Sequence, residues 1–261
     1  MANQPNTPQS RQDKIAAATP KQKKTTPIIA ALIVLVVIAG VAWAILSGKD
    51  SENGDAKNDV SVSGAPKGSE SASGGIVIGT AAEGAPRLDI YEDPQCPWCA
   101  VMHGRLGETA NKLAESGQAT VVVHIKTFMD SNLRNDSSKR SANGMMCAAD
   151  LDKFGPYHDI VLENQSQEGK GWTDAQLEQF AKDAGITGES FNTWQACQKD
   201  ETYFKYLAAV EDATARDGVT GTPQYRINGK DMTLTEQTSG AELESAIAEA
   251  GGVAPSAPAS N

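Results

Sequence analysis

The stretch YEDPQCPWCAVMHGRL, residues 91–106, decides the fold. It places Cys96 and Cys99 two residues apart, directly after a strand-like segment, RLDIYE at residues 87–92, and at the start of a helical pattern. The free N–H groups and the positive dipole end of a helix N-terminus stabilise an anion, so Cys96 is favoured as the thiolate that attacks disulfides. Pro97 suits the first helical turn, where its missing N–H is not needed. Cys99, one turn later, is placed to act as the resolving thiol.

Two other uses of the cysteine pair stay open at this point. Cys96, Cys99 and His103 offer three zinc ligands, but no second pair with metal spacing follows, because Cys147 and Cys197 lie far apart. A disulfide within Cys-x-x-Cys closes so small a loop that it constrains the unfolded chain little, which disfavours a purely structural role. We therefore expect no metal, and we expect His103 to lie on the helix surface.

An uncharged apolar segment, IIAALIVLVVIAGVAWAIL, occupies residues 28–46. At about 1.5 Å rise per residue it just spans a hydrocarbon core of about 30 Å, so we predict one transmembrane anchor rather than a buried core helix. The rival interpretation is a signal peptide cleaved after Ala44, because AWA has the spacing that signal peptidase reads. Residues 1–27 are polar and basic, so we expect a disordered head in the cytoplasm and an extracytoplasmic remainder.

The chain after the apolar segment divides into three parts. Residues 47–74 are almost wholly polar and predict a flexible linker, residues 75–252 predict a folded domain, and residues 253–261 predict a disordered tail. The head carries +4 of a net charge of −10, which leaves −14 on the rest. This acidic balance argues against binding to nucleic acid or to anionic lipid.

The pattern of the predicted domain is that of an α/β fold. Strands are expected at residues 76–79, 87–92, 119–128, 223–227 and 232–234, and helices at residues 100–116 and 240–250. The helix between the second and third strands predicts a parallel βαβ unit. Asn228-Gly229 predicts a hairpin turn. The long helical region at about residues 130–218 is most simply an insertion into one small sheet domain.

Two motifs together carry a resemblance. YEDPQCPWC after a strand, followed by GVTGTPQYRING at residues 218–229, resembles the DsbA-like thiol-disulfide oxidoreductases of the thioredoxin superfamily, especially the membrane-anchored, exported members of actinobacteria. The resemblance covers about residues 75–250 and implies a thioredoxin-like fold with a helical insertion. It also implies that the Thr222-Pro223 bond is cis and lies beside Cys96, and that the backbone of Thr222 pairs with substrate.

Other residues gain expected roles from the same resemblance. The best-known DsbA proteins have His at the position of Trp98 and Val at the position of Thr222, so we expect the pKa of Cys96 to be lowered, but less extremely. Glu92 is the candidate for the buried carboxylate that moves protons for the second cysteine; the alternative is a solvent-exposed loop acid.

The even number of cysteines in an oxidising compartment favours a structural disulfide between Cys147 and Cys197, and related actinobacterial proteins with a second bridge support it. The alternative is two buried free thiols.

The predicted function is exported disulfide formation. The CPWC pair would introduce disulfides into reduced secreted or cell-envelope proteins without a cofactor, because the cysteines carry the electrons. Similar proteins are reoxidised by a membrane quinone reductase of the DsbB or vitamin K epoxide reductase type. The alternatives are a disulfide reductase or isomerase of the same fold, or a non-enzymatic anchored binding module in which the pair is a stable bridge.

Overall fold

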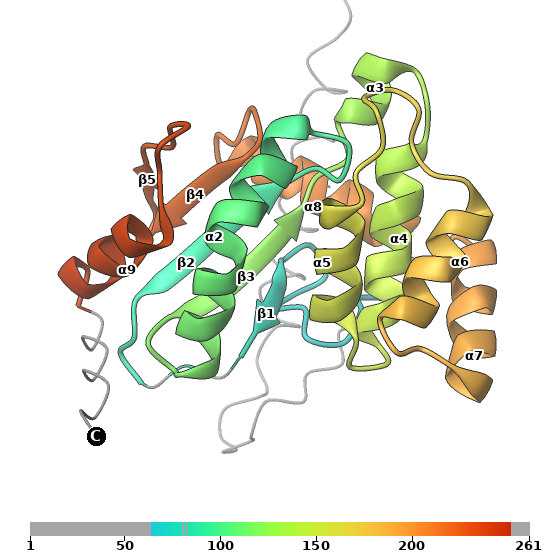
Figure 1. Cartoon of the computed structure of the whole chain (residues 1–261), viewed down its shortest axis with the longest axis horizontal. Helices are drawn as coiled ribbons and strands as arrows, with labels where there is room; N and C mark the ends of the chain where they lie inside the picture. Colours follow the sequence, from blue (N-terminus) through green and yellow to red (C-terminus); the bar gives the residue numbers. More distant parts are fainter. Residues whose placement is uncertain (1–63, 80, 82, 252–261) are drawn as a thin grey trace, which may run out of the picture. The chain divides into compact units, whose positions relative to one another are not determined.

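The computed structural model describes residues 64–79, 81 and 83–251, which belong to one compact unit (Figure 1). The predicted head, anchor and tail, and most of the predicted linker, lie outside the described residues. Within the described ranges no helix is long and apolar enough to cross a membrane.

A five-stranded sheet in the order β1-β3-β2-β4-β5 forms the centre. The strands are β1 (Ile76–Ile78), β2 (Arg87–Glu92), β3 (Thr120–Ile125), β4 (Gln224–Ile227) and β5 (Lys230–Met232). β2 and β3 are parallel, and the other neighbours are antiparallel. The two parallel strands are buried along most of their length; the sequence of β3 is largely apolar, whereas β2 also buries the charged residues Asp89 and Glu92.

Helix α2 (Pro97–Glu115) connects the two parallel strands, so the predicted βαβ unit is confirmed. α9 (Gly240–Glu249) packs beside α2, and Figure 1 shows both in front of the sheet. Leu106 of α2 and Leu243 of α9 are fully buried in the shared apolar core with Leu88 of β2. The start of α2 is therefore held directly beyond the end of β2.

The predicted helical insertion is confirmed, and it contains six helices. They are α3 (Met129–Leu133), α4 (Ser137–Ala149), α5 (Phe154–Glu163), α6 (Asp174–Asp183), α7 (Gly188–Lys199) and α8 (Phe204–Arg216). α4 contacts α5, α6, α7 and α8, and α5 also contacts α2. The insertion thus reaches back to the helix that carries the cysteine pair.

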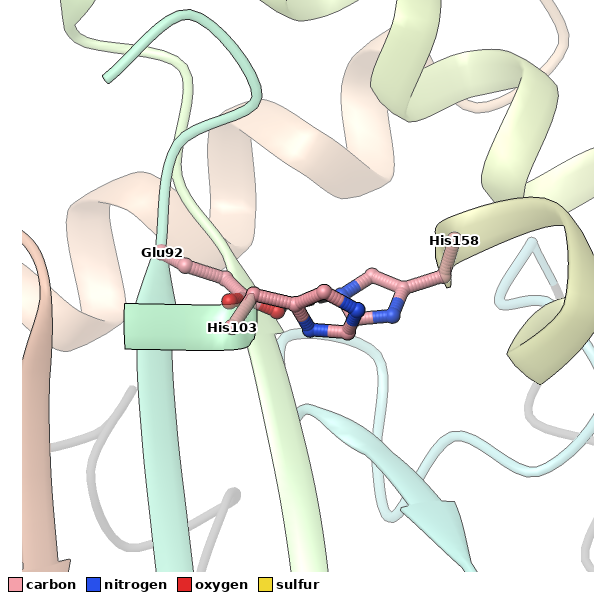
Figure 2. A group of neighbouring side chains, drawn as sticks. All are labelled: Glu92, His103 and His158. Atoms are coloured by element: carbon pink, nitrogen blue, oxygen red, sulfur yellow. Dashed lines mark hydrogen bonds and ion pairs between the residues drawn. The ribbon is translucent and has the colours of Figure 1, made fainter. Parts of the chain in front are cut away.

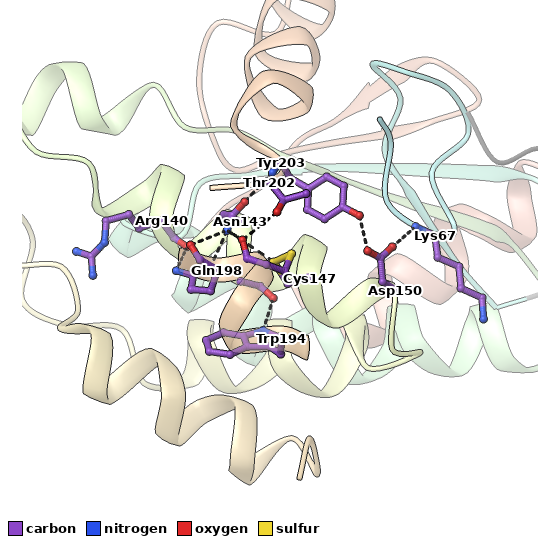
Figure 3. Close-up of a disulfide and its surroundings, with 11 residues drawn as sticks. Lys67, Arg140, Asn143, Cys147, Asp150, Trp194, Gln198, Thr202 and Tyr203 are labelled. Carbon is purple, nitrogen blue, oxygen red and sulfur yellow. Dashed lines mark hydrogen bonds between the residues drawn. A yellow bond between two sulfur atoms is a disulfide. The ribbon is translucent and has the colours of Figure 1, made fainter. Parts of the chain in front are cut away.

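A disulfide joins α4 to α7 through Cys147 and Cys197, the two cysteines expected to pair (Figure 3). Hydrogen bonds surround it: the Trp194 indole N–H donates to the Gly144 carbonyl at 2.9 Å, and the Asn143 carboxamide oxygen accepts the Tyr203 N–H at 2.8 Å. The cross-link fixes the packing of the insertion around α4.

Part of the predicted flexible linker is bound to the domain, which corrects the expected start of the fold at residue 75. The Lys67 N–H donates to Asp150 at 2.9 Å, Glu70 forms an ion pair with Arg87, and the Gly74 carbonyl accepts a hydrogen bond from a tyrosine hydroxyl of α8. These polar residues bury little apolar surface, so their hydropathy gave no sign of these contacts.

Candidate active site

The cysteine pair lies at the N-terminus of α2. Cys96 is the N-cap residue with an extended backbone, Pro97 occupies the first turn, and Cys99 lies one turn further on. Both thiols are free; Cys96 is 7% exposed and Cys99 is completely buried. The arrangement leaves Cys96 as the thiol that a partner sulfur can approach.

A cis peptide bond faces the pair. Thr222-Pro223 is cis, as the resemblance implied, and the Thr222 carbonyl oxygen lies 3.4 Å from Cys96 Sγ. The Thr222 hydroxyl is buried, and among the described residues the groups on which it acts are the two cysteine thiols. Cys96 and Thr222 are 126 positions apart in sequence, and the sheet brings them together because β4 pairs with β2.

The two thiols have opposite electrostatic environments. Hydrogen bonding by the Cys99 thiol, helped by Thr222 and by the N–H groups of Cys99 and Trp98, outweighs burial and lowers the pKa of Cys96 to about 6. Burial raises the pKa of Cys99 well above its usual value. At neutral pH the pair therefore holds one thiolate and one thiol.

Glu92 is the last residue of β2 and only 2% exposed, so the alternative of a solvent-exposed loop acid is wrong. Its carboxylate forms an ion pair with Nε2 of His158 (Figure 2). Burial penalises both charges, but their mutual attraction prevails: it lowers the pKa of Glu92 and raises that of His158 to about 10. His158 comes from α5, so the insertion supplies the counter-charge.

His103 completes this cluster, which corrects its expected place on the helix surface. Its side chain is only 10% exposed and meets the ring of His158 edge-on, with 5.0 Å between ring centroids. Gly107, one turn later on α2, leaves room for the ring, since a Cβ there would lie 2.9 Å from His103 Cε1. Docking of α5 covers the position, which the helical pattern of α2 alone does not reveal.

The side chains of Glu92, His103 and His158 offer ligand atoms within 4.8 Å of one another, a set that can be tested as a metal site. Ligands of one zinc ion stand about 3 Å apart, because each bond is about 2.0–2.1 Å long. Glu92 and His158 are in closer, direct contact, which leaves no room for an ion between them. The geometry is that of an ion pair, and we assign no metal to it.

The insertion also holds the loop that leads into the cysteines. The Gln165 amide donates to the carbonyl oxygens of Pro94 and Cys96 at 2.7 and 2.9 Å. Asp93 accepts the Met129 N–H at 3.0 Å, and its own N–H points at Cys99 Sγ, 3.5 Å away. Sequence reasoning missed these contacts, because isolated Gln and Asp residues in polar segments carry no distinctive signal.

Comparisons with known proteins agree with this geometry. Residues 71–249 match a protein-family model described as Thioredoxin. No curated protein sequence matches the chain. The fold is shared with DsbA from Mycobacterium tuberculosis, at 24% identity and a TM-score of 0.55 over 68% of this chain and 90% of that one.

Two further solved structures share the fold. MdbA of Corynebacterium diphtheriae is 23% identical, with a TM-score of 0.58 over 73% of this chain and 94% of that one. MdbA of Actinomyces oris is 22% identical, with a TM-score of 0.61 over 71% and 92%. Both are described as thiol-disulfide oxidoreductases. The family match, spanning the whole sheet and the insertion, identifies this chain as a member of the thioredoxin family.

Proposed function

We propose that the chain introduces disulfides into secreted or cell-envelope proteins through Cys96 and Cys99. The observation that carries the proposal is the contrast between the two thiols: Cys96, with a pKa of about 6, is a good leaving group, whereas Cys99 stays protonated. A stable thiolate in the reduced enzyme favours passing the disulfide on to substrate.

The reaction has two exchange steps. A substrate thiolate attacks Cys96 Sγ of the oxidised pair, the Cys96–Cys99 bond breaks, and Cys99 leaves as a thiolate that takes up a proton. A second substrate thiolate then attacks the substrate sulfur of the mixed disulfide and expels Cys96 as a thiolate. Two electrons have passed to the enzyme, and the substrate holds a new disulfide.

Several groups beside the cysteine pair support these steps. The backbone of Thr222, beside the Cys96 sulfur, pairs with the substrate chain, with cis Pro223 at its side. Glu92 relays the proton that Cys99 takes up or loses, because both are buried and the Glu92 charge acts on the Cys99 thiol. Trp98 and Pro97 lie between the cysteines and shape the approach to Cys96.

The sequence supports a location of the reaction outside the cell membrane and a membrane partner for reoxidation. The apolar segment at residues 28–46 anchors the chain in the cell membrane with the domain outside, and residues 47–63 tether it. A membrane quinone reductase of the DsbB or vitamin K epoxide reductase type reoxidises the pair. No cofactor is needed in the domain itself.

A disulfide reductase is the second candidate, and one observation favours it. The pKa of Cys96, about 6, lies nearer to that of thioredoxin, about 7, than to that of DsbA, about 3.5. The reduction potential decides between the two directions.

The deciding experiment equilibrates the full-length protein in detergent with glutathione buffers and traps free thiols at Cys96 and Cys99. A reduction potential of about −120 mV supports disulfide donation to substrates. A reduction potential of about −270 mV overturns this proposal in favour of disulfide reduction. The Cys96→Ser variant, which cannot form this couple, identifies any signal from other thiols.

A further inference from the structure

We propose that His158 of the insertion is a positioning residue that keeps Glu92 ionised, so that Glu92 can accept the proton of Cys99. The inference rests on the proposed roles of Cys96, Cys99 and Glu92, but not on the direction of electron flow. Cys99 changes protonation in both directions, so its proton acceptor matters in both.

The first step is the closeness of Glu92 to Cys99. Glu92 ends β2, and the N–H of the next residue, Asp93, points at Cys99 Sγ. The carboxylate and the sulfur are both buried, and the charge of Glu92 raises the pKa of Cys99. A thiolate and a carboxylate so placed repel each other, so a proton shared between them stabilises the pair.

The second step is what Glu92 would be without His158. A carboxyl group this deeply buried is favoured in its neutral form, which cannot accept a proton. The His158 imidazolium offsets this cost by direct contact with the carboxylate. His158 thus decides whether Glu92 is a base at neutral pH.

The third step is that His158 is held in place from both sides. Its ring stacks on Phe154, with 5.3 Å between centroids and 16° between planes, and meets His103 edge-on. Its Nδ1 lies 3.2 Å from Oδ1 of Asp159, so the ring stands between two carboxylates. The Asp159 side chain is 31% exposed, so the chain of contacts from Glu92 through His158 ends at solvent.

The titratable groups around this pair come from every element packed against it. They are Cys99 and His103 of α2, Asp159 and Glu163 of α5, and Tyr225 of β4. Burial and the charge of His158 lower the pKa of His103, and burial raises that of Tyr225, so both are neutral near pH 7. His158 therefore supplies the local positive charge.

The test uses the His158→Gln variant of the full chain, because an amide keeps a hydrogen bond to Glu92 but carries no charge. The reduced protein reacts with excess 5,5′-dithiobis(2-nitrobenzoate) in stopped flow. The first thionitrobenzoate is released when Cys96 attacks the reagent. The second is released when Cys99 attacks the Cys96 mixed disulfide, and the Cys99 proton passes to Glu92.

We expect the second phase of His158→Gln, relative to wild type, to fall about tenfold more at pH 6 than at pH 8, because Glu92 without its counter-charge titrates between these two pH values and is largely protonated at the lower one. The first phase stays unchanged. Adding His158→Gln to Glu92→Gln causes no further change in the pH profile, because the group that His158 acts on is already gone.

His124 provides the matched control. It is also buried and paired with a carboxylate, at 2.9 Å from Asp89, but it neighbours Ile125, the β3 partner of Glu92, and so faces the other side of the sheet. His124→Gln lowers the free energy of unfolding, and its second phase keeps the same pH profile as that of wild type. If His158→Gln behaves in the same way, its role is structural and the proposal is overturned.

Two outcomes separate this proposal from the one on which it rests. If wild type shows no second phase, the proposed roles of Cys96 and Cys99 are wrong, and this result does not depend on His158. If His158→Gln does not fold, NMR titration of the three histidines of wild type decides. A His158 imidazolium that persists to about pH 9 supports the proposal, and titration near pH 6.5 overturns it.

Discussion

At the scale of single residues, the hydroxyl of Thr222 tunes the reactive thiolate. It is buried near Cys96, and its hydrogen bond contributes to the lowered pKa of that thiol. A hydrogen bond to a charged group contributes about 1.5–3 kcal/mol, and about 1.4 kcal/mol corresponds to one pKa unit. Thr222 thus stabilises the Cys96 thiolate through its hydroxyl, which the Val of the best-known DsbA proteins lacks. Trp98 carries no charge and does not stabilise the thiolate in this way.

We predict that Thr222→Val raises the pKa of Cys96 from about 6 by about one unit. The pH dependence of Cys96 alkylation by iodoacetamide measures it. Thr220→Val, an exposed change two positions upstream, is the control and keeps the wild-type curve. An unchanged pKa in Thr222→Val would show that the helix N-terminus and Cys99 stabilise the thiolate without the hydroxyl.

Single residues also mark how far sequence reasoning reaches. Cys96, Cys99 and the Thr222-Pro223 bond belong to two contiguous motifs, and the family resemblance that these motifs carry implied their association. Glu92 was a candidate because strand alternation fixes the face of β2 on which it lies. His158 escaped notice, since its partner is 66 positions away and the pairing depends on how α5 docks on α2.

At the scale of elements, the disulfide cross-links α4 and α7, two helices of the insertion that supplies His158. Cys147 and Cys197 enclose a loop of sequence separation 50, and cross-linking such a loop stabilises the fold by about 4 kcal/mol in the chain-entropy model. Apart from the disulfide, α7 is held mainly by Trp194, the one residue of this helix that is buried. The insertion therefore depends on this bond more than the sheet does.

We predict that the variant Cys147→Ala with Cys197→Ala unfolds in urea with a free energy lowered by about 2–5 kcal/mol. Far-UV circular dichroism follows the unfolding transition. The Cys96→Ala variant is the control, because that change leaves the Cys147–Cys197 disulfide intact. A loss below about 1 kcal/mol would mean that packing around Trp194 holds α7 without the covalent link.

Elements also explain what the sequence could not predict about the fold. The parallel βαβ unit, the insertion and the Asn228-Gly229 turn follow from local patterns, and both turn residues have the positive φ that this hairpin requires. The attachment of residues 64–74 does not follow from local patterns, because it depends on single hydrogen bonds and on one ion pair with distant residues. Such contacts leave no periodic signal in hydropathy.

At the scale of the whole molecule, the buried Glu92–His158 pair couples the stability of the domain to pH. The pKa of His158 is raised to about 10 in the folded protein, against about 6.5 when unfolded. The stabilisation is therefore complete below pH 6.5 and is lost as the pH rises towards 10. The lowered pKa of Glu92 acts at the other end, where stability falls as acid protonates the carboxylate.

We predict that the oxidised protein loses unfolding free energy steadily between pH 7 and pH 9, and that His158→Gln removes most of this slope. The oxidised form is needed because a free Cys96, with its lowered pKa, would add stability over the same range. The window also avoids Asp93, whose pKa burial raises to about 7. Urea titrations at fixed pH values measure the slope, and His124→Gln should retain it. An equal slope in wild type and His158→Gln would mean that His158 is not charged in the folded protein, and with that the ion pair would lose its role in both stability and proton transfer.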